Sequence, residues 1–267
     1  MALPYSYLFV PGDDAYKIGK AMASDAGAVI LDLEDSVAPS RKDDALKISR
    51  DFLLTKSAHM PNKPETWVRL NTADEQAALN ELAALPLTMI TGIFYPKLSS
   101  HQQLVQIGHW LDALEKRDGV AQDKVKIIGI ITETANAMSG EQVGTLSRGH
   151  PRLRGYTWGV EDLSADLGRA PLMVSEEADR LITETAQMHC LYTAAAAGTE
   201  AIHTISTATH DLDALAETCN TARSLGYTAK MAIHPGQIET INQRLAPDQE
   251  TVKWAQRVLA LMDDHPN

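Results

Sequence analysis

The sequence predicts a (β/α)8 TIM barrel, because eight short apolar runs alternate with segments of helical pattern. The runs are continuously apolar, which is typical of parallel strands buried on both faces. Alternation of strands and helices favours βαβ units, and eight such units favour closure into a barrel. The expected strands are Ser6–Val10, Val29–Leu33, Thr66–Leu70, Gly92–Tyr95, Val125–Ile131, Gly155–Val160, Glu200–Ser206 and Ala229–Ile233.

The length of 267 residues suits one α/β barrel. The chain shows no linker, repeat or low-complexity tract, so we expect residues 1–267 to form a single domain. An open doubly wound sheet is the structural alternative. Its usual nucleotide fingerprints, GxGxxG and GxxxxGK[ST], are missing.

Helical spacing between the expected strands supports this fold. The pattern Thr72-Ala-Asp-Glu75 predicts a capping box at the start of a helix that runs to Leu85. The final helix carries an apolar stripe, and we expect it either to cover the barrel or to reach a neighbouring subunit. The other expected helices are Gln103–Lys116, Glu176–Ala197, the segment from Leu212 to Leu225, and the final helix Asp248–Met262.

Composition narrows the class of protein. Hydrophobic residues make up 44% and charged residues 22%, as in a globular protein with a large core. A net charge of −11 argues against a nucleic-acid-binding surface, although a local basic patch can still bind a small anion. Cys190 and Cys219 are expected to be free thiols in a reducing compartment. No run approaches the roughly 20 apolar residues of a membrane span, and no secretory signal is visible, so we expect a cytoplasmic protein with no membrane partner.

Polar residues follow nearly every expected strand. The active site of a barrel lies at the carboxyl ends of its strands, so these residues are the candidates for chemistry. They are Pro11-Gly12-Asp13, Asp32-Leu-Glu-Asp35, Arg69-Leu-Asn71, Pro96-Lys97, Glu133, Glu161-Asp162 and His234-Pro235.

Two of these acids are candidate metal ligands. Glu133 and Asp162 follow separate strands and can converge on one hard cation, Mg²⁺ or Mn²⁺, because such ions prefer carboxylate oxygens. Asp32, Glu34 and Asp35 are candidates for holding metal-bound water. The histidines form neither HxH nor HExxH spacing, which argues against zinc.

The basic candidates have alternative roles. Arg69 can grip a substrate carboxylate or offset charge on a forming enolate, and its structural alternative is an ion pair with an acid at the rim. Lys97 can form a Schiff base with a carbonyl, which is the metal-free alternative. His234, before a proline at a helix start, is expected to make a structural hydrogen bond.

As a set, these motifs resemble the HpcH/HpaI aldolase and citrate lyase β-subunit family. The resemblance extends over nearly the whole chain, and its strongest segments are Leu8-Phe-Val-Pro-Gly12, Val29-Ile-Leu-Asp-Leu-Glu-Asp-Ser-Val-Ala-Pro39, Val68-Arg-Leu-Asn71, Pro96-Lys97, Glu133-Thr-Ala135, Gly159-Val-Glu-Asp-Leu163 and Ala232-Ile-His-Pro235. It implies a TIM barrel that binds Mg²⁺ through Glu133 and Asp162. It also implies cleavage or formation of carbon–carbon bonds next to CoA or carrier-protein thioesters and 2-keto acids, and a homotrimer or hexamer.

The resemblance also yields candidate site residues. We expect Arg69, Glu133 and Asp35 to act in catalysis. We expect Arg69, Glu133, Pro11, Gly12 and Lys97 to bind substrate, with a CoA thioester as co-substrate.

The chain departs from the family pattern at Tyr5 and Leu46, where arginine is usual, and at Ala208, where an acid is usual. It also ends soon after the last helix. We therefore expect a stand-alone, citrate-lyase-like carbon–carbon lyase. The alternatives are a thioesterase of the malyl-CoA type, and a catalytically impaired subunit that binds small acids.

Overall fold

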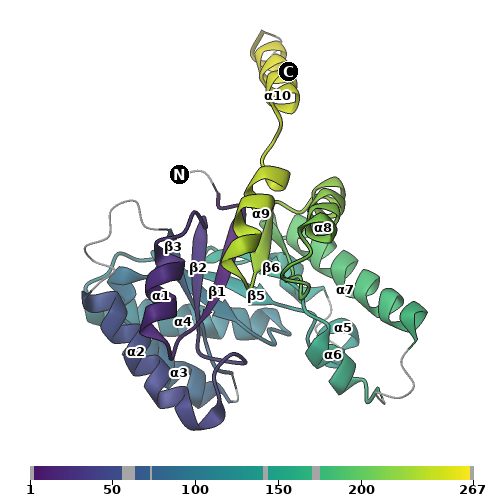
Figure 1. The fold of residues 1–267 in the computed structure, drawn as a ribbon. Helices are drawn as coiled ribbons and strands as arrows, with labels where there is room; N and C mark the ends of the chain where they lie inside the picture. The colour runs from purple at the N-terminus through teal and green to yellow at the C-terminus, as the bar shows by residue number, and fades with distance from the viewer. Residues whose placement is uncertain (1–2, 56–63, 73, 141–143, 170–174, 265–267) are drawn as a thin grey trace.

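Eight parallel strands close into a barrel in chain order, which confirms the predicted (β/α)8 fold (Figure 1). The computed structural model describes residues 3–55, 64–72, 74–140, 144–169 and 175–264. The first and last strands pair with each other and close the ring. The strands are β1 (Ser6–Pro11), β2 (Ala28–Asp32), β3 (Glu65–Arg69), β4 (Gly92–Tyr95), β5 (Lys126–Ile130), β6 (Leu153–Thr157), β7 (Glu200–His203) and β8 (Ala229–Ala232).

Helices surround the barrel, and most of them connect one strand to the next (Figure 1). The α-helices are α1 (Ala15–Met22), α2 (Lys42–Thr55), α3 (Glu75–Ala84), α4 (His101–Asp118), α5 (Ala135–Ser139), α6 (Glu161–Asp166), α7 (Glu176–Ala196), α8 (Leu212–Leu225), α9 (Ile238–Leu245) and α10 (Gln249–Asp264). Short 3₁₀ turns lie at η1 (Pro39–Arg41), η3 (Leu87–Met89), η4 (Thr145–Arg148) and η6 (Pro235–Gln237).

Aromatic side chains fill the barrel interior. Tyr7, Trp67 and Phe94 meet edge to face, with ring centroids 5.6 to 6.2 Å apart. Such contacts add specific geometry to the burial of large apolar surfaces. The interior is therefore a packed core, and the polar residues gather at its carboxyl end.

Gly92 lets β4 fit beside this core. A Cβ atom at this position would collide with the backbone carbonyl of Lys126 on β5 and with the ring of Trp67. Only glycine allows the two strands and the indole to pack so closely.

Several local predictions were wrong, including the end of the seventh strand, which is His203 and not Ser206. The capping box at Thr72–Glu75 does not form, because Asp74 caps α3 by accepting a hydrogen bond from Ala77 N at 2.7 Å. Thr72 Oγ1 has no hydrogen-bond partner, and Ala73 lies outside the described residues. Strand β6 begins and ends earlier than expected, so Asp162 lies in the first turn of α6.

Helix α10 extends away from the barrel (Figure 1). Its large apolar side chains are exposed, among them Trp254, Leu259, Leu261 and Met262. Of the two expected arrangements, the one in which this helix covers its own barrel is therefore excluded (Figure 1), and contact with a neighbouring subunit stays a prediction. Within the described part of the chain, no helix is both long and apolar enough to cross a membrane.

Candidate active site

A cavity of about 570 Å³ opens at the carboxyl ends of the strands. Four predicted site residues that are distant in sequence line it together: Asp35, Arg69, Glu133 and Asp162. The rest of its wall is formed by Phe9, Asp32, Ser36, Ile130, Trp158, Gly159, Glu161, Thr204, Ile205, Thr207, Met231 and Ile233. The convergence expected from the barrel rule is present.

Glu133 lies between β5 and α5, and its side chain is buried. Its Oε2 accepts a hydrogen bond from the backbone N–H of Lys97 at 2.7 Å. Burial, aided by the nearby charge of Asp162, raises the pKa of Glu133 to about 7. A carboxylate with this environment readily exchanges a proton or a cation near neutral pH.

Asp162 lies across the cavity in α6 and is partly exposed. Its Oδ2 lies 3.1 Å from the ammonium nitrogen of Lys97. The same ammonium lies 3.8 Å from Glu34 Oε1.

Lys97 is therefore bound by acids rather than free to attack a carbonyl. Although partial burial lowers it, the hydrogen bond to Asp162 and the nearby carboxylates raise the pKa of Lys97 above its ordinary value. A protonated amine is a poor nucleophile, which disfavours the Schiff-base alternative.

Arg69 ends β3 and is held mainly by one acid. Its Nε and Nη2 donate to the two carboxylate oxygens of Asp32 at 2.6 and 2.7 Å. The guanidinium carbon lies 4.8 Å from the ring centroid of Phe9. The structural alternative for Arg69, a pair with an acid at the rim, is thus present, and Nη1 is the nitrogen left to face other groups.

The acids at the end of β2 and just after it differ in burial and in their contacts. Asp32 is buried and also accepts hydrogen bonds from Glu34 N and Ser36 N, so both its oxygens are engaged within the protein. Asp35 is exposed, and its Oδ2 lies 3.2 Å from Arg69 Nη1. Asp35 is better placed than Asp32 to meet a metal-bound water.

Glu34 has a feature that was not predicted from the sequence, namely a buried side chain with an unsatisfied oxygen. It is buried, and burial raises its pKa to about 8. Its Oε2 lies 3.0 Å from Arg69 Nη1, but without the alignment of a hydrogen bond, so this buried oxygen is unsatisfied. The crowding of acids in Asp32-Leu-Glu-Asp35 was the available signal, but sequence alone did not show that Glu34 is buried with an unsatisfied oxygen.

Pro11 and Gly12 do not line the cavity. Gly12 N donates to Asp32 O at 2.8 Å, and a Cβ on Gly12 would lie 2.7 Å from Ser49 Oγ. Close packing of β1 and β2 therefore accounts for this glycine, and its part in substrate binding stays a prediction. His234 caps η6 by accepting from Gly236 N at 3.1 Å, as expected of a structural histidine.

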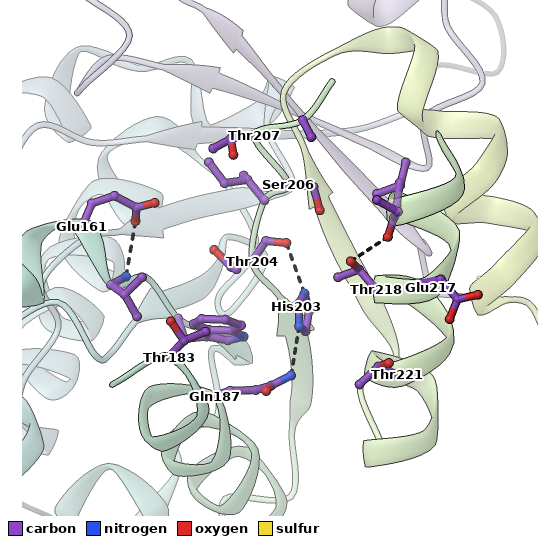
Figure 2. Close-up of a pocket in the computed structure, with 16 residues that line it drawn as sticks. Glu161, Thr183, Gln187, His203, Thr204, Ser206, Thr207, Glu217, Thr218 and Thr221 are labelled. Carbon is purple, nitrogen blue, oxygen red and sulfur yellow. Dashed lines mark hydrogen bonds between the residues drawn. The ribbon is translucent and has the colours of Figure 1, made fainter. Parts of the chain in front are cut away.

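A second cavity, of about 590 Å³, adjoins the first between β7, α7 and α8 (Figure 2). Many of its lining groups are hydroxyls, including those of Thr183, Ser206, Thr207 and Thr221. The two cavities share the wall residues Trp158, Glu161, Thr204, Ile205 and Thr207. This second cavity was not predicted, because its lining residues share no recognisable spacing in the sequence.

His203 lies at the centre of this chamber, with Gln187 below it (Figure 2). Its Nδ1 is 3.0 Å from Nζ of Lys230, which is fully buried, and its Nε2 is 3.0 Å from Gln187. Burial and the charge of Lys230 lower the pKa of His203 to about 3, so this imidazole is neutral near pH 7. A neutral imidazole held in this way serves as a fixed polar wall, not as a proton carrier.

The first cavity suits one divalent cation. Five acids line it beside Arg69, namely Asp32, Asp35, Glu133, Glu161 and Asp162. Next to Arg69, a buried oxygen of Glu34 has no hydrogen bond. In the described residues, no three His, Cys, Asp or Glu side chains are clustered to hold a metal. The candidate set is thus two carboxylates, Glu133 and Asp162, which suits Mg²⁺ because that ion keeps several water or substrate oxygens.

Comparison with known proteins agrees with this arrangement. The sequence profile of the HpcH/HpaI aldolase/citrate lyase family matches residues 5–235. The chain belongs to the HpcH/HpaI aldolase/citrate lyase family. The family predicted from the motifs is therefore confirmed.

Individual members of the HpcH/HpaI family cover almost the whole chain. A citrate lyase subunit beta-like protein of Mycobacterium tuberculosis is 30% identical over 95% of this chain and 83% of its own length. A (3S)-malyl-CoA thioesterase of Cereibacter sphaeroides is 26% identical over 97% of this chain and 83% of its own. The structure of protein CitE from M. tuberculosis with magnesium, acetoacetate and coenzyme A is 28% identical, covers 100% of this chain and 90% of that one, and has a TM-score of 0.69.

Proposed function

We propose that this protein is a Mg²⁺-dependent carbon–carbon lyase of the citrate lyase β-subunit type. It cleaves or forms a bond next to a short acyl thioester or a 2-keto or hydroxy acid. The observation that carries the proposal is that Arg69, Glu133 and Asp162, from three different parts of the barrel, line one cavity. The relative with magnesium, acetoacetate and coenzyme A supports the same chemistry.

The chemical problem in such a reaction is negative charge. Breaking a carbon–carbon bond β to a carbonyl leaves an enolate, and the rate depends on how well that charge is stabilised. Glu133 and Asp162 would hold Mg²⁺, which supplies Lewis-acid stabilisation and a template for substrate oxygens when bound.

The chain's own groups then orient the substrate. Arg69 is fixed by Asp32, so its Nη1 presents a positive charge at a constant position in the cavity. We propose that this nitrogen contacts a substrate carboxylate, with Asp35 as the exposed acid beside it. A preorganised donor of this kind need not reorganise as the charge develops.

The remaining assignments are proposals of the same standing. A CoA thioester is the proposed co-substrate, because the relative of known structure binds coenzyme A. We also propose a homotrimeric or hexameric assembly in the cytoplasm, with neither nucleic acid nor a membrane as partner.

A thioesterase is the second candidate function, because one curated relative of similar identity is a (3S)-malyl-CoA thioesterase. Product analysis separates the two. Incubating the protein with Mg²⁺ and malyl-CoA should release glyoxylate and acetyl-CoA if it is a lyase, and free CoA with intact malate if it is a thioesterase. A broad panel of thioesters and hydroxy acids without any turnover would contradict both and favour a binding subunit.

A further inference from the structure

Lys97 connects three acids that come from three different parts of the barrel. Its backbone N–H donates to Glu133 at 2.7 Å, and its ammonium lies 3.1 Å from Asp162 and 3.8 Å from Glu34. One lysine thus contacts both proposed metal ligands at once, through its two ends.

The backbone of Lys97 is held in an unusual conformation. Its φ of 54° lies in the left-handed region, which residues with a side chain adopt rarely and at an energetic cost. The surrounding structure must enforce this conformation, and the Glu133 hydrogen bond is one contact that does so. In this conformation the lysine side chain reaches Asp162, with the ammonium 3.1 Å from Oδ2.

The position of the ammonium has a consequence for metal binding. An ammonium and Mg²⁺ compete for the same carboxylate oxygens, and they repel each other at short range. The Lys97 side chain is 40% exposed and has a flexible four-carbon stem, so it has room to withdraw into solvent.

We propose that Lys97 is an internal cation that occupies the Asp162 side of the metal site and withdraws when Mg²⁺ binds. It keeps the acids of the site together in the metal-free protein, and it weakens metal affinity by competing for Asp162. In this role Lys97 is a positioning residue for the metal ligands. The inference rests on the proposed function in one respect, namely that Glu133 and Asp162 hold the metal.

The test is a direct measurement of Mn²⁺ binding by electron paramagnetic resonance, without substrate. Lys97→Met removes the charge and keeps the stem, and Lys97→Gly also relieves the left-handed strain. Both should bind Mn²⁺ about threefold to fivefold more tightly than the unmodified protein, the range for loss of a half-exposed ion pair. Lys97→Arg keeps the charge and should not bind more tightly, and Lys116→Met, an exposed lysine on α4, is the matched control.

The outcomes separate the two proposals. Equal or weaker Mn²⁺ binding by both Lys97→Met and Lys97→Gly overturns the competition and leaves the metal site standing. A wild-type protein that binds no Mn²⁺ overturns both. A circular-dichroism melt of each variant shows whether the barrel is intact.

Discussion

Buried acids dominate the site at the level of single residues. Glu133 and Glu34 have pKa values raised to about 7 and about 8, in each case mainly by burial. A metal-bound carboxylate must be ionised, so protons compete with the cation over the range in which these groups titrate.

Mg²⁺ affinity should therefore depend on pH. A raised pKa means that Glu133 is mostly protonated at pH 6 and mostly ionised at pH 8. We expect Mg²⁺ binding to be about tenfold weaker at pH 6 than at pH 8, because only about a tenth of a group with this pKa is then ionised. Isothermal titration calorimetry across this range would measure it, and a flat profile would contradict the assignment of Glu133.

Glu133→Gln should abolish Mg²⁺ dependence and activity together while leaving the fold intact. The amide is close in size to the carboxylate but lacks its charge, so we expect activity to fall by at least about a hundredfold. Turnover with added Mg²⁺ and thermal unfolding are the measurements, and Glu184→Gln on exposed α7 is the control. A fully active Glu133→Gln protein would exclude the proposed ligand pair.

Arg69 serves the fold as well as the site. Arg69→Met would leave Asp32 as a buried carboxylate without its cation, so we expect a loss of about 3 to 5 kcal/mol in the free energy of unfolding. Arg69→Lys keeps the charge but not the two-pronged contact, and should lose less stability. Urea unfolding measures the difference. Equal stability of the unmodified protein, Arg69→Met and Arg69→Lys would show that the Arg69–Asp32 ion pair does not stabilise the fold.

The order of strands and helices decides which of these residues meet, and that order could be predicted from the sequence. The carboxyl-end rule brought Asp35, Arg69, Glu133 and Asp162 into one cavity without any structure. It misplaced the end of β6, because Tyr156-Thr-Trp-Gly-Val160 continues an apolar pattern after the sheet pairing has stopped. It also could not show that Asp32 engages Arg69 twice, since side-chain direction depends on packing.

Helix α4 is joined to β6 by a buried arginine. Arg152 is 1% exposed and contacts Glu115 at 2.7 Å, with Asp112 and Asp123 also within ion-pair range. Arg152→Met should lower the free energy of unfolding by about 3 kcal/mol, because it leaves Glu115 buried without its cation. Arg180→Met, which breaks an exposed pair on α7, should change it by less than about 1 kcal/mol. Chemical denaturation compares the two, and similar losses would contradict the argument.

At the level of the whole molecule, the barrel buries its apolar side chains within the chain, whereas α10 leaves its own exposed. The apolar stripe predicted for the last helix is present, but it faces solvent within this chain. The spacing of apolar residues in the sequence shows that a helix has an apolar face. It does not identify what covers that face. The structure excludes the arrangement in which α10 covers the barrel, which the sequence could not do, and contact with a second subunit stays a prediction.

Removing residues 247–267 should leave the barrel folded and reduce the assembly. We expect the exposed Trp254, Leu259, Leu261 and Met262 to contact a second copy of the chain, because such an apolar face is unfavourable in water. Light scattering after size-exclusion chromatography should show a smaller assembly for the truncated protein, while its melting temperature at high dilution stays close to that of the full chain. An unchanged assembly mass would exclude α10 from the subunit contact.

The edge-to-face packing of Tyr7, Trp67 and Phe94 limits the direction from which a substrate can enter the site. These rings fill the barrel interior beneath the first cavity, so a substrate approaches Glu133 and Asp162 from the carboxyl end of the strands and not along the barrel axis.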